Sequence, residues 1–190
     1  MPPITPPIDP PPINDYIEPG ESMLVVVRRH PIGLVFLYLE AFIGVAAVLG
    51  LFFFASPSSF RNLHGEAYRL FVAGVIFGIA VLIIFLLAAT VVYRESKLIV
   101  TNKSLVQVLQ KALFSRKISR LSMSNVEDVN AEQKGILATI FNYGTLVVQT
   151  AGEMENFIFP YCPDPNKFAH IILEARQAYA QALQEEAGGG

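Results

Sequence analysis

The chain has 190 residues, of which 53% are hydrophobic and only 16% are charged. Charged residues make up about a quarter of an ordinary soluble domain, so this composition indicates a protein that is not wholly water-soluble. The formal net charge of −2 gives no reason to expect nucleic acid binding. The single cysteine, Cys162, and three scattered histidines predict no disulfide, no metal site and no cofactor.

Residues 1–21 are rich in proline, and the unit PPI recurs in them. We expect a disordered tail of polyproline II character that acts as a tether, with a docking site for a proline-binding partner as the alternative. Residues 22–32 are interpreted as a juxtamembrane segment. Within it, the apolar run 22–27 could form an extra strand or lie at the membrane surface.

Two apolar blocks follow, at 33–55 and 70–92, and each has 23 residues. A helix of that length spans about 34 Å, which is enough to cross a hydrocarbon core of about 30 Å. We therefore predict a transmembrane helical hairpin, joined by an external loop at 56–69. Two buried helices of a soluble protein are the alternative interpretation.

Basic residues predict the orientation of this hairpin. Arg61 and Arg69 belong to the loop between the blocks. The flanks hold a larger basic group, consisting of Arg28, Arg29, Arg94, Lys97 and Lys103. This bias places both termini in the cytoplasm and predicts a multi-pass protein of the bacterial inner membrane.

Three residues within the blocks are candidates for a helix–helix interface. Glu40 is the single charge of the first block, and Gly74 and Gly78 form a GxxxG pattern in the second. Such a pattern lets two helices approach closely, either within the hairpin or between two copies of the chain. Glu40 could instead be an ion-relay residue of a transporter.

From Tyr93 onward, alternating residues and turn signals predict six strands and two helical segments. The strands are expected at 95–101, 104–110, 115–121, 126–133, 144–150 and 156–161. A helical turn or plug is expected at 135–141. A C-terminal amphipathic helix should begin at the N-cap Asp164 with Pro165 as its first residue. Residues 93–184 thus predict a cytoplasmic pleckstrin-homology-like antiparallel barrel or sandwich, and 185–190 a flexible tail. The whole is a membrane protein of the α+β class.

Several stretches resemble the bacterial pleckstrin-homology domain found in membrane-flanked proteins. They are LIVTNK at 98–103, ISRLSMSNVEDV at 118–129 and QKGILATIFNYGTLVV at 133–148. Pro19-Gly20-Glu21 and Arg29-His30-Pro31 ahead of the first block add to the likeness, whereas Lys103-Ser104 replaces a basic pair common in the family. The resemblance implies a membrane-anchored interaction module and supplies no catalytic residues. In the Asn142–Thr145 turn, we expect Gly144 to adopt a positive φ.

The favoured function is a non-catalytic scaffold that presents this domain at the inner leaflet to a protein partner or a second copy. An alternative is binding of anionic lipid through a basic group formed by Lys111, Arg116, Lys117 and Arg120. Against it, residues 93–190 carry ten basic and ten acidic residues. Accessory function in a transporter or channel complex is a further alternative. No motif of an enzyme is recognised.

Overall fold

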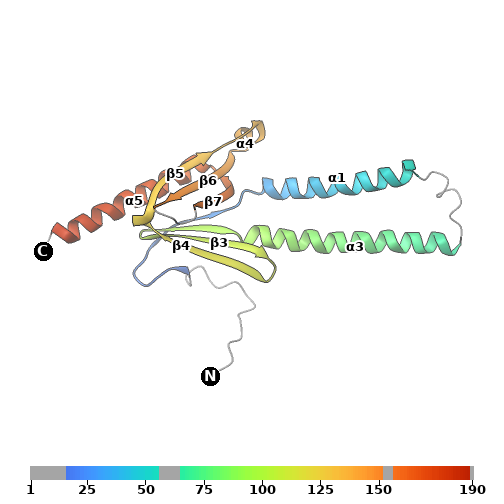
Figure 1. The fold of residues 1–190 in the computed structure, drawn as a ribbon, viewed down its shortest axis with the longest axis horizontal. Coiled ribbons are helices and arrows are strands. Elements are labelled where there is room, and N and C mark those ends of the chain that lie inside the picture. Colours follow the sequence, from blue (N-terminus) through green and yellow to red (C-terminus); the bar gives the residue numbers. More distant parts are fainter. Residues whose placement is uncertain (1–15, 56–64, 152–155, 189–190) are drawn as a thin grey trace, which may run out of the picture.

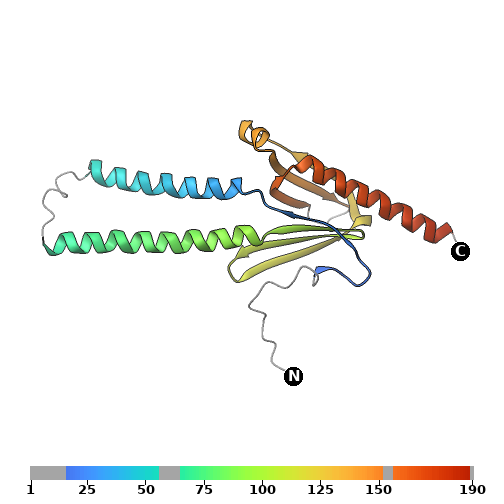
Figure 2. The same ribbon diagram turned by 180° about the vertical axis from the view of Figure 1, so that it is seen from behind.

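The structure of the chain is a computed structural model, and it describes residues 16–55, 65–151 and 156–188. Two long helices lie side by side at one end of the molecule (Figure 1). Strands and a third long helix form a small domain at the other end, and the same arrangement is seen from behind (Figure 2). The long axis of the molecule therefore runs from the helical hairpin to the domain.

The two long helices are α1 (Ile32–Ala55) and α3 (Glu66–Glu95). Within them, Ile32–Leu51 and Tyr68–Glu95 are long and apolar enough to cross a membrane. Their apolar side chains are largely exposed, which distinguishes the pair from the core helices of a soluble protein. Helix α3 starts four residues before the predicted block and includes the last part of the predicted loop, whose remainder, 56–64, lies outside the described residues.

A four-stranded antiparallel sheet contains strands from both sides of the helical hairpin. Its order is β1-β2-β3-β4, with β1 at Met23–Arg28, β2 at Lys97–Thr101, β3 at Ser104–Ala112 and β4 at Ser115–Ser122. Residues 23–27 of the apolar run 22–27 therefore form an extra strand, as the first of its two interpretations expected. Because β1 pairs with β2, the helical hairpin is an insertion between two neighbouring strands of one sheet.

The second sheet has the order β5-β6-β7 and is also antiparallel. Its strands are β5 (Val126–Glu132), β6 (Tyr143–Thr150) and β7 (Phe157–Pro163). The 3₁₀ turn η2 (Met123–Asn125) precedes β5, and the short helix α4 (Ile136–Ile140) joins β5 to β6. All six strands predicted from 95 onward are present, with ends that differ by at most two residues.

The predicted barrel is wrong, and the alternative of two packed sheets is the observed one. Strands β4 and β5 are joined by η2 and belong to separate sheets. At the opposite edges, the His30 amide next to β1 donates a hydrogen bond of 2.6 Å to the Tyr161 carbonyl of β7. The sheets thus meet at this edge without forming a continuous ladder among the described residues.

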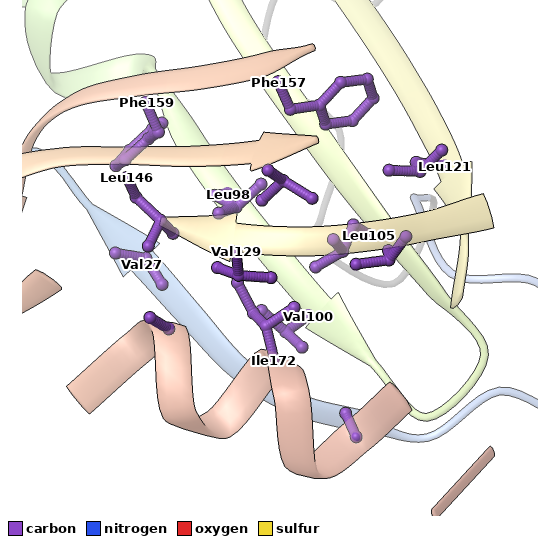
Figure 3. Close-up of a cluster of buried hydrophobic side chains, with 14 of the residues drawn as sticks. Val27, Leu98, Val100, Leu105, Leu121, Val129, Leu146, Phe157, Phe159 and Ile172 are labelled. Carbon is purple, nitrogen blue, oxygen red and sulfur yellow. The ribbon is translucent and has the colours of Figure 1, made fainter. Parts of the chain in front are cut away.

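The core fills the space between the sheets and helix α5 (Pro165–Gly188) (Figure 3). Side chains from both sheets meet there, and Ile172 of α5 is fully buried among them. The predicted N-cap is confirmed, because Asp164 Oδ1 accepts a hydrogen bond of 3.4 Å from the Lys167 amide. Helix α5 continues to Gly188, beyond the end predicted at 184, since its last turns are rich in the good helix formers Ala, Gln and Glu.

Helix α4 corresponds to the predicted helical turn but does not plug an opening. Ala138 is its buried residue, whereas the large apolar side chains around it face outward. Figures 1 and 2 show α4 projecting from the domain near the start of α1. The buried core is closed by α5 instead, because α5 packs on β5, β6 and η2.

Candidate functional site

The connections between the helical hairpin and the domain are very short. Strand β1 ends at Arg28 and α1 begins at Ile32, while α3 ends at Glu95 and β2 begins at Lys97. Side chains from both connections, from α1 and from sheet β5–β7 meet here. We call this group the junction cluster: Arg29, His30, Gly33, Phe36, Tyr93, Tyr143 and Tyr161.

Tyr93, near the end of α3, ties the two helices together. Its hydroxyl donates a hydrogen bond of 2.6 Å to the His30 carbonyl, just before α1. Gly33 lies against the same ring, since a Cβ at this position would lie 2.6 Å from Tyr93 Cζ. The Arg29 guanidinium lies 5.4 Å from the ring centroid on a face of Tyr93. The glycine is therefore required by close packing at this point.

Aromatic rings extend the junction cluster onto sheet β5–β7. The His30 ring stacks on Tyr143 with centroids 5.7 Å apart, and Tyr143 stacks on Tyr161 at 6.0 Å. Phe36 of α1 contacts Tyr143 edge-on at 6.3 Å. Tyr161 also contacts Tyr93, with centroids 6.1 Å apart. These contacts attach both helices to sheet β5–β7, whereas their chain connections lead into sheet β1–β4.

Arg29 is the charged member of the junction cluster. Burial lowers the pKa of its guanidinium, and interactions with Tyr93 and Tyr161 partly offset that effect. Its Nε is buried and has no hydrogen-bond partner among the residues that the structure describes. A guanidinium stays protonated at ordinary pH, so the cluster holds a fixed positive charge among aromatic rings. These contacts can fix the orientation of the helices relative to the domain.

The predicted helix–helix residues are not brought together within the chain. Gly74 and Gly78 have nothing within 4 Å of a Cβ built on them, and Glu40 is exposed on α1. The hydrogen bond that links the two helices lies nearer the domain, at 2.7 Å between Tyr38 Oη and Thr90 Oγ1. A role of Gly74 and Gly78 in contact with a second copy stays a prediction.

The segment Tyr16–Ser22, here the N-terminal strap, packs on the outer face of sheet β1–β4. Tyr16 is buried against Ile99, Val106 and Val108. The prediction of a disordered tail through residue 21 is therefore wrong for 16–21, because the Tyr16 ring covers apolar side chains of the sheet. Residues 1–15 lie outside the described residues.

Two of the predicted lipid-contact residues bind this strap. Arg116 donates a hydrogen bond of 2.5 Å to Tyr16 Oη, and Arg120 donates one to the Tyr16 carbonyl at 2.5 Å. Lys117 lies between them in β4, so its side chain points to the opposite face of the sheet. Lys111 is exposed near the end of β3. The four residues do not form a single basic patch.

Glu21 anchors the end of the N-terminal strap. Its carboxylate accepts hydrogen bonds from Ser104 Oγ at 3.1 Å and from Thr101 Oγ1 at 3.3 Å, and it pairs with Arg120 at 3.3 Å. The Glu21 side chain is only 5% exposed. Gly20, with φ of 86°, makes the turn that brings Glu21 to this position. The Pro19-Gly20-Glu21 motif thus serves to fasten the strap to the β2–β3 turn.

The prediction for the Asn142–Thr145 turn needs correction. The positive φ falls on Asn142, at 49°, and Gly144 has none. Glycine is needed at 144 for a different reason, because a Cβ there would collide with the Glu132 carbonyl oxygen and lie 3.0 Å from Pro165 Cγ. Close approach of β6 to β5 and α5 therefore requires this glycine.

Pockets lie both near the junction and between the sheets. Three basic residues, Arg28, Arg94 and Lys97, and the acidic Glu95 line a pocket of about 250 Å³ where α3 meets β2. Arg28 is placed opposite Lys97 by the β1–β2 pairing, and burial lowers the pKa of the Lys97 ammonium. A groove of about 460 Å³ lies between strands β3 and β4 of one sheet and β7 of the other, and its lining includes Leu109, Lys117 and Ile158.

Comparison with known proteins identifies the family. Within the described residues, no three His, Cys, Asp or Glu side chains are close enough to hold a metal ion together. No curated protein and no solved structure matches the chain significantly. The family model of the bacterial PH domain matches residues 34–176, which include both long helices and most of the domain. The chain therefore belongs to the bacterial PH domain family.

Proposed function

We propose that this protein is a non-catalytic interaction module, anchored in the bacterial inner membrane by α1 and α3. It presents its domain to a protein partner or to a second copy of the chain. The observation that carries this proposal is the insertion of an exposed apolar helical hairpin between β1 and β2. Two short connections and the junction cluster then hold the domain against the membrane surface.

The exposure of the helices supports a membrane location. Large side chains such as Phe42, Phe77 and Phe85 face outward along the hairpin. Water-soluble monomers seldom expose a continuous apolar surface of this extent, whereas a bilayer covers it. Because β1 and β2 pair, the segments before α1 and after α3 lie on one side of that membrane. The basic residues Arg28, Arg29 and Arg94 favour the cytoplasmic side.

The groove between the sheets is the surface that we assign to a partner. It is open, because β4 and β7 do not pair, and Gln107 Nε2 bridges the sheets by donating a hydrogen bond of 2.8 Å to the Ile158 carbonyl. Leu109 and Ile158 supply apolar contact area, and Lys117 supplies a cation. An apolar groove with a few polar groups is the usual form of a peptide or ligand site.

Photo-crosslinking in native membranes tests this function. A photoreactive amino acid is placed at Ile158 in the groove and, as a matched control, at Gln184 on the exposed end of α5. The proposal predicts one defined adduct, from a partner or a second copy, at Ile158 and a weaker one at Gln184. Equal, diffuse labelling at both positions would count against a specific interaction module.

Binding of anionic lipid headgroups is a second candidate, favoured by the pocket of Arg28, Arg94 and Lys97. Each basic residue near an anionic leaflet contributes about 1 kcal/mol to attraction. The test uses the full chain in vesicles with spin-labelled phosphatidylglycerol or phosphatidylcholine. A preference for phosphatidylglycerol that is lost in the Arg28→Gln/Arg94→Gln variant supports this function, and an unchanged preference excludes this pocket.

A further inference from the structure

Two apolar loop tips project from the domain toward the end where the helices leave it. One is the β3–β4 tip, Leu113 and Phe114, in which Phe114 is 99% exposed. The other is the α4 tip, in which Ile136 is 79% and Ile140 67% exposed, with Leu137 and Phe141 beside them. Figures 1 and 2 show the β3–β4 tip and α4 on opposite sides of the helical pair.

The level of the β3–β4 tip follows from the strand register. Lys97, the first residue of β2, is opposite Val108, so residues 109–112 of β3 continue past the end of β2. They run along the end of α3, where the Gln110 amide donates a hydrogen bond of 3.3 Å to Ser96 Oγ. The β3–β4 tip therefore lies beside the last turns of α3, beyond Lys97, where β2 begins.

The depth of the α4 tip along the helical pair follows from a pocket that α4 and α1 both line. Ala138 of α4 and Phe36 of α1 line the same pocket. Phe36 lies three residues beyond Gly33, which corresponds to about 4.5 Å along the helix axis. The headgroup region extends about 5–8 Å beyond the hydrocarbon on each side of a bilayer. The exposed side chains of α4 consequently reach the depth of the headgroups.

From these positions we infer that both tips insert into the same leaflet that the helices enter. This inference rests on the proposed function, since it requires that α1 and α3 cross the membrane. The occupant is the lipid interface, because the apolar tips continue the apolar surface of the helices on either side. Lys111 lies next to the β3–β4 tip and is exposed, as expected for a cation at headgroup level. Lys134, next to the α4 tip, is also exposed and pairs with Glu132 at 2.6 Å.

Three points of attachment would then fix the tilt of the domain. The helical pair resists translation, and a tip on each side resists rocking about that pair. An isolated apolar tip would have little effect, but the helices hold both tips at the bilayer surface throughout. The domain consequently presents the groove between its sheets in one orientation.

Depth-dependent quenching tests the inference on the full chain in lipid vesicles. A fluorescent maleimide is attached to Ser115→Cys or Thr139→Cys, each next to a tip whose apolar residues are retained. Phe85→Cys in the middle of α3 reports the span, and Gln184→Cys reports the aqueous domain. Burial raises the pKa of the native Cys162 thiol to about 12, so this thiol does not compete for label at neutral pH.

The inference predicts quenching of both tip labels by lipids spin-labelled near the headgroup, well above the Gln184 control. Phe114→Glu should abolish quenching at Ser115→Cys, and Ile140→Glu should abolish it at Thr139→Cys, while Phe114→Leu retains it. Tip labels that match the Gln184 control, with Phe85→Cys quenched by deep spin labels, would overturn the inference and leave the anchor standing. An unquenched Phe85→Cys would overturn both.

Discussion

Gly33→Ala tests the packing of the junction cluster at its tightest point. A Cβ at this position would lie 2.6 and 2.7 Å from two carbons of the Tyr93 ring. The ring has to move, yet it is held by the His30 carbonyl and by contacts with Arg29 and Tyr161. We therefore expect the substitution to separate the start of α1 from the end of α3.

The magnitude follows from three contributions, two unfavourable and one favourable. Overpacking of a tight site costs about 1–3 kcal/mol. Loss of the bond between the Tyr93 hydroxyl and the His30 carbonyl costs about 0.5–1.5 kcal/mol. Alanine in place of glycine in a helix returns about 0.5–1 kcal/mol. The free energy of unfolding should fall by about 0.5–4 kcal/mol, the sum of these contributions.

The assay is a urea titration of the full chain in detergent micelles, followed by the near-ultraviolet circular dichroism of its tyrosines. Gly44→Ala is the matched control, because Gly44 is in the same helix with nothing within 4 Å of its Cβ position. A double-mutant cycle with Tyr93→Ala should remove most of the Gly33→Ala penalty. Equal stability of the Gly33→Ala and Gly44→Ala variants would refute the reasoning.

Three further predictions concern the strap, the β5–β6 turn and the buried thiol. Glu21→Ala should lower the free energy of unfolding by about 1–3 kcal/mol because it removes the ion pair with Arg120 and the hydrogen bonds from Ser104 and Thr101. Limited proteolysis should then cut at the strap, and uncut protein would argue against this role of Glu21. Gly144→Ala should destabilise the domain by about 1–3 kcal/mol through collision with the Glu132 carbonyl, whereas an unchanged thermal midpoint would contradict that collision. Burial, followed by the charge of Asp164, raises the pKa of the Cys162 thiol to about 12 from 9.0. The contribution of the protonated thiol to stability is therefore complete below about pH 9 and is lost between about pH 9 and 12. Cys162→Ala should remove this part of the pH dependence of unfolding.

The local pattern of the sequence predicts most of the secondary structure. Alternation of apolar and polar residues indicates the strands from Lys97 onward, and Asp164-Pro165 marks the start of α5. Closure of the barrel was wrongly predicted because alternation indicates where strands lie in the sequence and not which of their edges pair. The short turn η2 redirects the chain into a second sheet, and no local signal in Met123–Asn125 indicates this.

The junction cluster was missed for a similar reason. Tyr93, Tyr143 and Tyr161 lie far apart in the chain, and each reads separately as an ordinary tyrosine near a turn or a span end. Pairing of β1 with β2 across the helical insertion places His30 near Tyr93, the bond from the His30 amide to the Tyr161 carbonyl adds β7, and β6–β7 pairing adds Tyr143. Aromatic residues close to the end of an apolar helix were the available signal. Likewise, Arg116 and Arg120 looked like lipid contacts because the strap that binds them is distant in sequence.

The central claim is that two short connections and the junction cluster hold the domain in a fixed orientation on the membrane. The direct measurement is an electron–electron distance distribution between spin labels at Ile84 of α3 and Gln177 of α5, with the full chain in lipid nanodiscs. We expect a single narrow distribution, because the domain is held rigidly against the helices. We also expect that a Gly/Ser linker after Ser96 alone broadens it little, because β1 still tethers α1, whereas linkers after both Arg28 and Ser96 broaden it strongly. A wild-type distribution as broad as that of the double-linker variant would contradict the account.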